Sequence, residues 1–408
     1  MAEIIDHSIA RAPSVADGRR SELSQPARTG LLDGVASQAW QDLARRALEP
    51  NGYYLPGWEL AVNASARGRT GTAALSVWDD GRPAQLIGLM PVTSLWRAYR
   101  LPLPVLASGH PYGTLCTPLI DSDRAETAIT RLLEAARRTG ARAVLLRDMS
   151  TAGPAMRAFE DVLRRDGLRP RIVQSHERAL LDATGDGDAV LQDALGAKKL
   201  KELGRQRRRL AEHGAVRFEV ARSPGEVTDA LETFLTLEAS GWKGRRGTAL
   251  VQHNGDAAFI RRAPPALAQD HACEIVTLHA GDAAVASGLV LRHQDRAFFF
   301  KLGVDERFAK YSPGVQLTLD LTRHLCSDPA IRTADSTAGP DHPMINPIWR
   351  GRLAIGDVLI PLHARDPAVE IIHAALIARR EGLGFARRAV HAIRDWRKNR
   401  NPTPQPRH

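Results

Sequence analysis

The residues best suited to chemistry surround one junction, which runs from residue 298 to residue 321. Its first part, FFFKLGV, is apolar and aromatic enough to predict a strand that is buried on both faces. The sequence Tyr311-Ser312-Pro313-Gly314 then opens a helix, because proline suits the first helical turn. Such a junction directs unpaired N–H groups and the positive end of a helix at one point. The junction alone therefore predicts an anion site of the kind that holds a phosphate or pyrophosphate.

Three side chains in the flanking segments can accept or transfer a proton. Asp335 and His342 follow the next expected strand, and the carboxyl-side ends of strands face the site in an open α/β sheet. His342 titrates near neutral pH, and burial would raise the pKa of Glu238. Structural roles are the alternative, since Asp335 can cap a turn and His342, before a proline, can fix a loop.

A glycine-rich segment, GWKGRRG, follows Glu238. Trp242 and Lys243 are candidates for lining a substrate channel there. The alternative is a helix C-cap with Trp242 anchored in the core. We favour the functional interpretation, because a Trp-Lys-Gly loop with three glycines is an unusual way to end a helix for packing alone.

The composition is that of a globular protein with a basic surplus. The chain has 408 residues, 43% hydrophobic and 25% charged, which is enough for two domains. Lysine and arginine outnumber aspartate and glutamate by 56 to 46, and the surplus is concentrated in residues 198–209 and 387–400. Such runs suit nucleic acid, acidic lipid headgroups or anionic cofactors. Cys116, Cys273 and Cys326 lack C-x-x-C spacing, which argues against a zinc site or disulfide scaffold and fits a reducing cytoplasm.

The sequence predicts a cytoplasmic protein. The N-terminal residues lack an apolar core of signal-peptide length, and no segment approaches the ~18 apolar residues of a membrane span. Residues 367–400 predict a helical tail with Ile371, Ile372, Ala375 and Leu376 on one face and arginines later. This tail suits peripheral contact with a membrane surface or RNA, or packing on the protein itself.

The elements that must position the candidate residues form two α/β units. In the first we expect helices at 37–48, 125–139 and 154–166, strands on both sides of the turn at 79–81, and strands at 143–146 and 171–181. In the second we expect helices at 193–213, 224–240, 255–269 and 315–327, and strands at 216–220, 273–280, 284–292 and 331–335 around the aromatic strand. The helix at 255–269 should be interrupted at Pro264-Pro265.

Three motifs carry a resemblance to a known family. LEASGWKGRRGTAL (237–250), the YSPG junction and DSTAGPDHPMINPIWRGRLAIGD (335–357) occur in the order seen in BioF-like, or CelD (BcsL), acetyltransferases. That family belongs to the GNAT superfamily and is related in fold to the FemABX aminoacyltransferases. The resemblance implies an α/β fold with a mixed sheet, the acyl-CoA N-acyltransferase (GNAT) fold, in two tandem units. The expected divisions are a disordered leader at 1–30, a degenerate GNAT-like unit at 31–182, the BioF-like domain at 190–362 and a basic helical tail at 366–408.

The resemblance also implies a reaction, transfer of an acyl group from acetyl-CoA or another acyl-CoA to an amine, without a metal. The acceptor would be a small molecule or an amino sugar, in exopolysaccharide, cellulose or envelope metabolism. Pantetheine would pair with Leu302, Gly303 and Val304. The pyrophosphate would lie on Tyr311, Ser312, Pro313, Gly314 and Val315, of which only Gly314 keeps the glycines usual in a GNAT loop. Asp335, His342 and Glu238 would be catalytic, and Trp242 and Lys243 would contact substrate.

Two other functions stay open. A FemABX-like transferase would use aminoacyl-tRNA, and the basic run at 198–209 would suit tRNA phosphates. The leucines of the same run also predict an ordinary amphipathic helix with its basic residues in solvent. The second alternative is a non-catalytic GNAT-fold accessory protein of polysaccharide synthesis.

Overall fold

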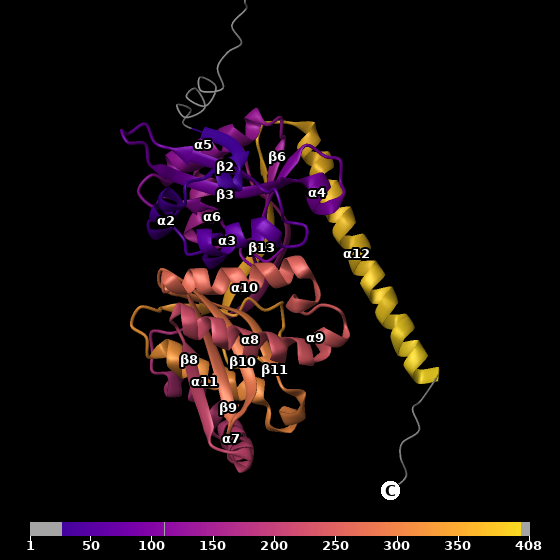
Figure 1. Ribbon diagram of the computed structural model, residues 1–408. Coiled ribbons are helices and arrows are strands. Elements are labelled where there is room, and N and C mark those ends of the chain that lie inside the picture. Colours follow the sequence, from indigo (N-terminus) through magenta and orange to yellow (C-terminus); the bar gives the residue numbers. More distant parts are fainter. Residues whose placement is uncertain (1–26, 110, 401–408) are drawn as a thin grey trace, which may run out of the picture.

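Two α/β units are stacked along the long axis of the molecule (Figure 1). The computed structural model describes residues 27–109 and 111–400, apart from the side chains of residues 242, 243 and 384–400. Most of the leader expected at 1–30 thus lies outside the described residues, and residues 27–30 belong to strand β1 (Ala27–Leu31).

The first unit has the helices and strands that its sequence pattern predicts, with several additional short elements. Its helices are α2 (Ser37–Arg45), α3 (Pro56–Ser65), α4 (Leu95–Tyr99), α5 (Ala125–Arg138) and α6 (Pro154–Arg165). Its strands after β1 are β2 (Ala73–Trp78), β3 (Leu86–Ser94), β4 (Val105–Ser108), β5 (Leu119–Ile120), β6 (Ala143–Ser150) and β7 (Arg171–Asp182).

The second unit departs from prediction at two helices and one strand. Its helices are α7 (Gly187–Leu210), α8 (Pro224–Ser240), α9 (Trp242–Arg245), α10 (Asn254–Gln269) and α11 (Pro313–Cys326). Its strands are β8 (Val216–Ala221), β9 (Cys273–Ala280), β10 (Ala283–His293), β11 (Arg296–Val304) and β12 (Thr333–Asp335), and β13 (Gly351–Pro361) and α12 (Pro367–Arg400) follow. The expected interruption of α10 at Pro264 is wrong, because the buried face of α10 against α3 and α8 holds the helix together. Helix α7 bends at Gly196, whose φ of 71° suits glycine, and β13 was not predicted.

The strands form one mixed sheet in which the two units exchange strands. The order is β1-β2-β3-β4-β6-β13-β7-β12-β11-β10-β9-β8, with β5 beside β3. Strand β7 of the first unit pairs with β12 of the second, while β13, from the end of the chain, lies between β6 and β7. The predicted class, an α/β fold with a mixed sheet in two units, is confirmed.

An aromatic core joins the two units. Tyr53 and Trp58 of the first unit contact Phe298 and Phe300 of β11, with ring centroids 5.7 Å apart for Tyr53–Phe298 and 4.9 Å for Trp58–Phe300. Phe259 of α10 lies 5.0 Å from Trp58 in an edge-to-face arrangement. All five side chains are buried, and the predicted burial of the strand is confirmed for Phe298–Phe300, whereas Leu302 and Val304 are half-buried. Cys116 and Cys273 are buried, Cys326 is half-buried, and all three are free.

A buried histidine also joins the units. His293, at the end of β10, accepts a hydrogen bond from the Asn51 N–H on Nδ1 (2.8 Å), so its Nε2–H donates to the Ala44 carbonyl (2.9 Å). Burial lowers the pKa of His293 to about 4. The side chain is therefore a neutral link between the first unit and the β10–β11 turn.

We expect this histidine to make the protein acid-sensitive between pH 6.5 and pH 4. The unfolded chain takes up a proton near pH 6.5 and the folded chain only near pH 4, so falling pH lowers the free energy of unfolding by roughly 2–3 kcal/mol. His293→Gln keeps a donor and an acceptor but cannot titrate. Urea unfolding at several pH values should show the stability gap between wild type and variant closing toward pH 4. If the stability of the wild type and of His293→Gln changed with pH in parallel, His293 would not be the source of the acid sensitivity.

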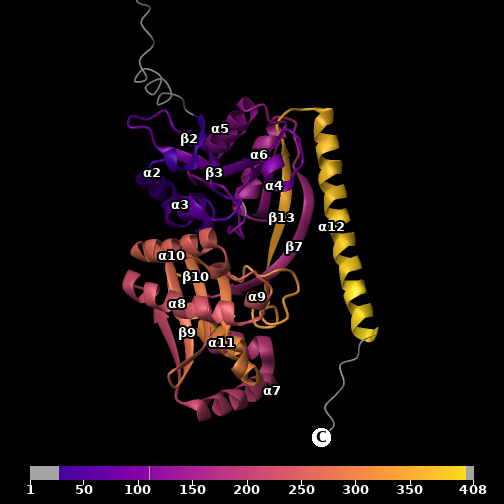
Figure 2. The same ribbon diagram turned by 45° about the vertical axis from the view of Figure 1, so that its right-hand side comes forward.

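Helix α12 begins on the first unit and extends alongside the second (Figures 1 and 2). Val369, Ile372 and Leu376 pack on the sheet, whereas Ile371 is 64% exposed, so the apolar face is narrower than predicted. No helix among the described residues has the length and apolar character needed to cross a membrane.

Candidate functional site

Strand β11 leaves its parallel neighbour partway along its length. The pairing of β11 with β12 ends at Phe298 and Asp335, while β11 continues to Val304. Phe300 is an extra residue in the pairing with β10, since Lys301 faces Leu289 and Phe299 faces Val290. The resulting β-bulge re-aims the side chains beyond it. The Thr337 hydroxyl donates to the Phe299 carbonyl (2.7 Å) at the point of divergence.

The helix predicted at the YSPG junction begins where expected. Pro313 occupies the first turn of α11, and Ser312 precedes it with a φ of 54° and makes no side-chain capping bond. The Tyr311 ring is buried, and its hydroxyl lies 2.9 Å from His213 Nε2. One 3₁₀ segment, Glu306–Tyr311, connects the end of β11 to the start of α11.

Two glycines of the predicted donor site are explained first by packing. A Cβ on Gly303 would lie 2.7 Å from the Glu238 nitrogen, so glycine here lets α8 approach β11. A Cβ on Gly314 would lie 3.0 Å from Leu302 and 3.2 Å from Val304, and Met344 is also close at 3.4 Å. The predicted residues at 302–304 and 314 are therefore brought together, with the 336–349 loop beside them.

Glu238 lies at the end of β11 that carries Gly303, and it pairs with Lys301, which was not predicted from the sequence. Its side chain is buried; Oε2 accepts from the Leu250 N–H (3.0 Å), and Oε1 is 3.4 Å from Lys301 Nζ. The Lys301 side chain is 25% exposed, so its ammonium reaches the solvent side of the pair. The signal for Lys301 was present, because it is the one charged residue in FFFKLGV.

Asp335 is placed at a different level of the sheet. It is fully buried, forms an ion pair with Arg178 of β7, and accepts from the Thr337 N–H (2.8 Å). Arg178 also donates to the Thr114 carbonyl (2.6 Å). Asp335 pairs with Phe298, whereas the backbone of Glu238 lies against Gly303, roughly 16 Å further along β11. The structure does not bring Asp335 and Glu238 together.

His342 lies on the loop that reaches the start of α11. Its Nδ1 is buried and makes no hydrogen bond with the described residues, and burial lowers the pKa of this half-buried imidazole. Met344, two residues on, is the side chain that approaches Gly314. A neutral imidazole with an available nitrogen can accept a proton.

The glycine-rich segment forms a short helix. Trp242 and Lys243 open α9, and their side chains lie outside the described part of the chain. A Cβ on Gly244 would lie 1.8 Å from the Ala239 carbonyl, so glycine lets α9 fold back on the end of α8. Arg245 pairs with Glu306 (2.8 Å), which fastens α9 to the turn after β11.

The first unit contributes polar groups to the same side of the molecule. Tyr112 stacks against Phe259 (5.0 Å), and its backbone carbonyl accepts from Trp58 Nε1 (2.8 Å). Burial, and then the Asp256 carboxylate, raise the pKa of Tyr112, with a smaller effect of Glu238. The sequence around Tyr112 has no helical or strand periodicity that would have pointed to it.

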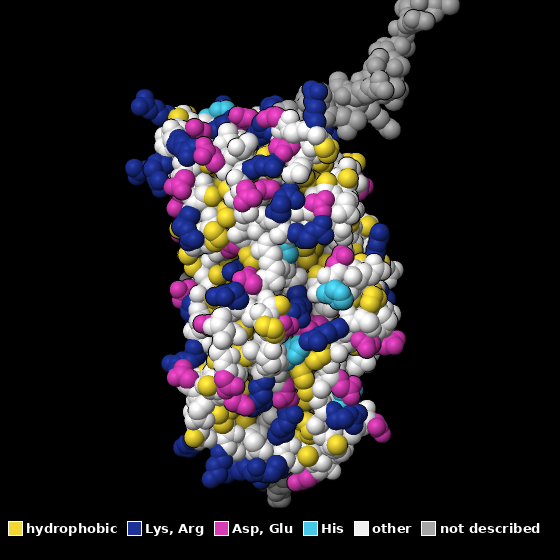
Figure 3. All heavy atoms as spheres, turned by 90° about the vertical axis from the view of Figure 1, so that its left-hand side faces the viewer, with side chains coloured by type: hydrophobic (Ala, Val, Ile, Leu, Met, Phe, Trp, Pro, Cys, Tyr) yellow, Lys and Arg dark blue, Asp and Glu magenta, His cyan; other side chains and the backbone are white. Residues whose placement is uncertain are grey.

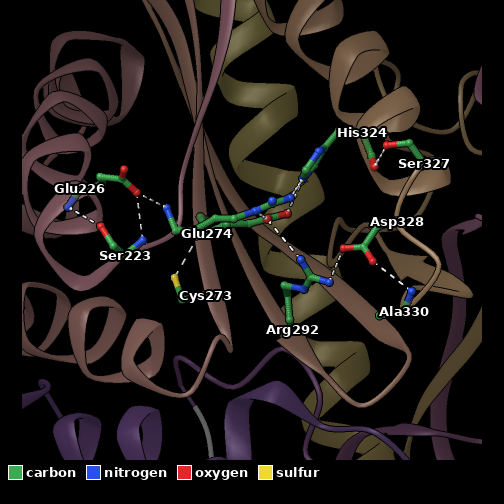
Figure 4. Close-up of polar contacts among 10 residues, drawn as sticks. Ser223, Glu226, Cys273, Glu274, Arg292, His324, Ser327, Asp328 and Ala330 are labelled. Atoms are coloured by element: carbon green, nitrogen blue, oxygen red, sulfur yellow. Dashed lines mark hydrogen bonds and ion pairs between the residues drawn. The ribbon is translucent and has the colours of Figure 1, made fainter.

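A second polar cluster lies on β9, at the opposite end of α11 from the junction (Figure 4). The buried Glu274 carboxylate accepts from His324 (3.0 Å), Arg222 (3.2 Å) and Arg292 (3.4 Å), and Arg292 also pairs with Asp328. Burial acts to raise the pKa of Glu274, but the hydrogen bond from His324 and the two arginines outweigh it and lower the pKa overall. The cluster ties α11 to the sheet and takes no part in the candidate site.

Glu274→Gln is expected to lower the free energy of unfolding by about 2–3 kcal/mol at pH 7, because it removes the central charge from two arginines and weakens the hydrogen bond with His324. Since the pKa is lowered, this stability is present above pH ~4.5 and is lost as pH falls further. Glu219→Gln, at a half-exposed ion pair on β8, is the control and should change stability by less than about 1 kcal/mol. Equal losses in urea unfolding would contradict the central role of Glu274.

Comparison with known proteins gives the class. Residues 197–342 match the family described as "Acetyltransferase (GNAT) domain". The chain resembles the crystal structure of FemX at a TM-score of 0.53 and 11% identity, over 85% of this chain and 100% of that chain. It resembles a conserved protein of unknown function from Bacteroides thetaiotaomicron VPI-5482 at a TM-score of 0.53 and 10% identity, over 82% of this chain and 100% of that chain. The C-terminal domain of a putative lysylphosphatidylglycerol synthetase from Agrobacterium fabrum matches at a TM-score of 0.49 and 13% identity, over 84% of this chain and 95% of that chain.

Residues 197–342 are thus similar to a GNAT acetyltransferase domain, and the two-unit α/β fold around them is similar to that of FemX. No curated protein matches the chain. The narrower BioF-like or CelD assignment stays a prediction. Within the described ranges, no group of three or more His, Cys, Asp or Glu side chains is arranged to hold a metal.

Proposed function

We propose that this protein is an N-acyltransferase that moves an acyl group, acetyl in the simplest case, from coenzyme A to an amine. The observation that carries the proposal is the divergence of β11 from β12 after Phe298, followed by the N-terminus of α11 at Pro313, inside the region that matches the GNAT domain. An acyl-CoA needs both features, a strand edge for its amides and a positive helix end for its pyrophosphate.

The donor would lie along the end of β11. Val304 directs its backbone groups away from β10, because Asp305 N–H bonds to the Val285 carbonyl and alternate residues face opposite edges. The pyrophosphate would then meet the first turn of α11 at Ser312–Val315. In this proposal Gly303 and Gly314 shape the site through packing, by bringing α8 and the side chains of Leu302 and Val304 close.

The amine nitrogen attacks the thioester carbonyl, the C–N bond forms, the C–S bond breaks, and the coenzyme A thiolate leaves. The acceptor, bound as an ammonium, gives its first proton to a base before the attack, and the nitrogen gives a second proton, which reaches the thiolate, when the amide forms. We assign the base role to His342, which has an available buried nitrogen and lies on the loop whose Met344 reaches the start of α11. Glu238 with Lys301 would position the acceptor, and Asp335, held by Arg178, would fix the loop that carries His342.

The test is isothermal titration of the purified protein with acetyl-CoA and with a long-chain acyl-CoA, at low and at physiological salt. Saturable binding at one site per chain, with affinity in the range of about 1–100 μM, is expected. Once a turnover assay exists, His342→Gln should lower kcat by about 10²–10⁴-fold. A folded protein that binds neither thioester would overturn the proposal.

A second candidate, transfer from an aminoacyl-tRNA, is favoured by the surface next to the donor site. Basic residues lie exposed along α7, namely Lys198, Lys199, Lys201, Arg205, Arg208 and Arg209. Lys and Arg side chains gather at the lower end of the molecule in Figure 3, where Figure 1 places α7. Gln316 of α11 donates to the Leu203 carbonyl of α7 (2.9 Å), so this basic helix packs beside the first turns of α11.

The two donors make different predictions. A tRNA donor requires binding that weakens steeply with salt and is lost when Arg208 and Arg209 are both changed to Gln. An acyl-CoA donor requires binding that survives both changes. Failure of both donors to bind would leave a non-catalytic accessory role, for instance in polysaccharide synthesis.

A further inference from the structure

A cavity lies beneath α12, on the face of the first unit's sheet that is turned away from α5 and α6. Along β6, Val144 and Leu146 pack toward α5 and α6, while Ala143 and Leu145 pack toward α12. The first turns of α12 close this second face with Val369, Ile372 and Leu376. Beyond Leu376 the apolar contact ends and a cavity of about 450 Å³ follows. Its size is within the range of small-molecule sites.

Two adjacent arginines of α12 supply its positive charge. The Arg379 guanidinium lies 4.0 Å from the centroid of the Tyr99 ring, and Arg380 Nη1 donates to the Val173 carbonyl (3.1 Å). Neither arginine forms an ion pair with a carboxylate in the described part of the chain. A guanidinium carries five N–H donors, so these contacts leave most of them available to a ligand.

The sheet side of the cavity contributes one carboxylate. Asp357 lines the cavity, where its Oδ1 accepts from the Asp148 N–H (2.9 Å) and its Oδ2 from the Gln174 amide (2.7 Å). Arg147 lies on the Tyr99 ring at 5.5 Å, which adds a third guanidinium close by. The lining itself carries two guanidinium groups and one carboxylate, so the cavity keeps a positive surplus.

The remaining wall is apolar. Leu145 and Val173 of the sheet and Leu376 and Leu383 of α12 complete the lining. A ligand that fills such a space needs a compact apolar body and one anionic group. Arginine pairs bind carboxylates and phosphates in bidentate geometry.

We propose that this cavity binds a small organic anion, with its carboxylate or phosphate on Arg379 and Arg380 and its body against Leu376 and Val173. The ligand would bridge α12 to the sheet, so its binding would also hold α12 in place. This site is separate from the donor junction of the second unit and does not depend on the proposed acyltransferase activity.

The test uses the full chain and three probes, inorganic phosphate, acetate and butyrate, with sodium chloride keeping the ionic strength constant. Thermal unfolding of the wild type should shift upward in a saturable way with at least one probe. Butyrate should act at lower concentration than acetate if the apolar wall is used, and phosphate against acetate identifies the preferred head group. Arg379→Gln/Arg380→Gln should weaken the effective probe at least about tenfold, the loss of one charge-assisted contact.

The matched control is Arg164→Gln/Arg165→Gln, an adjacent exposed pair at the end of α6 that should respond as the wild type does. Should the cavity variant fail to fold, Leu383→Glu compared with Leu383→Gln replaces it, because Leu383 is 43% exposed at the cavity and tolerates a polar side chain. Leu383→Glu is expected to weaken the probe and Leu383→Gln to leave it nearly unchanged. No saturable shift in the wild type, or equal responses in cavity and control variants, would overturn the proposal.

Discussion

Val315→Glu is expected to weaken acetyl-CoA binding by about a hundredfold or more. Val315 is half-buried in the first turn of α11, where the pyrophosphate is proposed to lie. Two like charges about 5 Å apart at an effective dielectric constant of about 20 repel by roughly 3 kcal/mol, which corresponds to two orders of magnitude in affinity. A glutamate in the first turn also interacts favourably with the helix dipole, so folding should be preserved. Titration calorimetry measures the effect.

Val315→Gln is the matched control, because glutamine has nearly the same shape as glutamate but carries no charge. It should bind acetyl-CoA within about threefold of the wild type, and the loss in Val315→Glu should diminish at high salt. Gly314 is a poorer position for this test, since a Cβ there approaches Leu302 and Val304 and would alter the packing. Equal affinities of the two Val315 variants would place the phosphates elsewhere.

Arg178→Met is expected to lower the free energy of unfolding by about 3–5 kcal/mol. The change leaves the Asp335 carboxylate buried between the units without its ion-pair partner, and breaking one side of a buried pair has this typical cost. The Thr114 carbonyl also loses its donor. Urea unfolding followed by tryptophan fluorescence and by circular dichroism measures the loss.

A double-mutant cycle separates the pair from its surroundings. Arg178→Met combined with Asp335→Asn should recover at least about 1–2 kcal/mol relative to Arg178→Met alone, because no unpaired charge remains. Arg207→Met, at the more exposed pair with Asp320, is the control and should cost less than about 1 kcal/mol. Additive losses at Arg178 and Asp335 would show that the two side chains are not coupled.

The local pattern of the sequence was sufficient for most elements of the second unit. Alternation and turn residues predicted the hairpin of β9 and β10, and the Pro313 signal predicted the start of α11. The prolines of α10 led to a wrong prediction of a break in the helix. Proline lowers helix propensity, and the tertiary packing that offsets this cost cannot be read from the sequence. Helix propensity depends on residues that are neighbours in the chain, whereas the burial of α10 against α3 and α8 depends on distant segments.

The long-range contacts of the candidate site were beyond sequence reasoning. Asp335 was found by its position after a strand, but its partner Arg178 is 157 residues away in the chain. Lys301 is recognisable in the sequence as a charged residue in an apolar strand, but only the packing of α8 shows that it forms an ion pair with Glu238. Strand β13 was missed because Gly351–Pro361 carries no turn that pairs it with a neighbouring segment.

The exchange of strands between the units sets an order on folding during synthesis. The sheet of the first unit has a place between β6 and β7 that stays empty until residue 361 has left the ribosome. At typical elongation rates the intervening chain takes roughly 10–30 s to make, and through that time two strand edges lack their partner. Unpaired edges invite pairing with other chains, so the nascent protein should need protection by a chaperone. A gene cut between the units would yield two fragments, each missing a strand that the other carries.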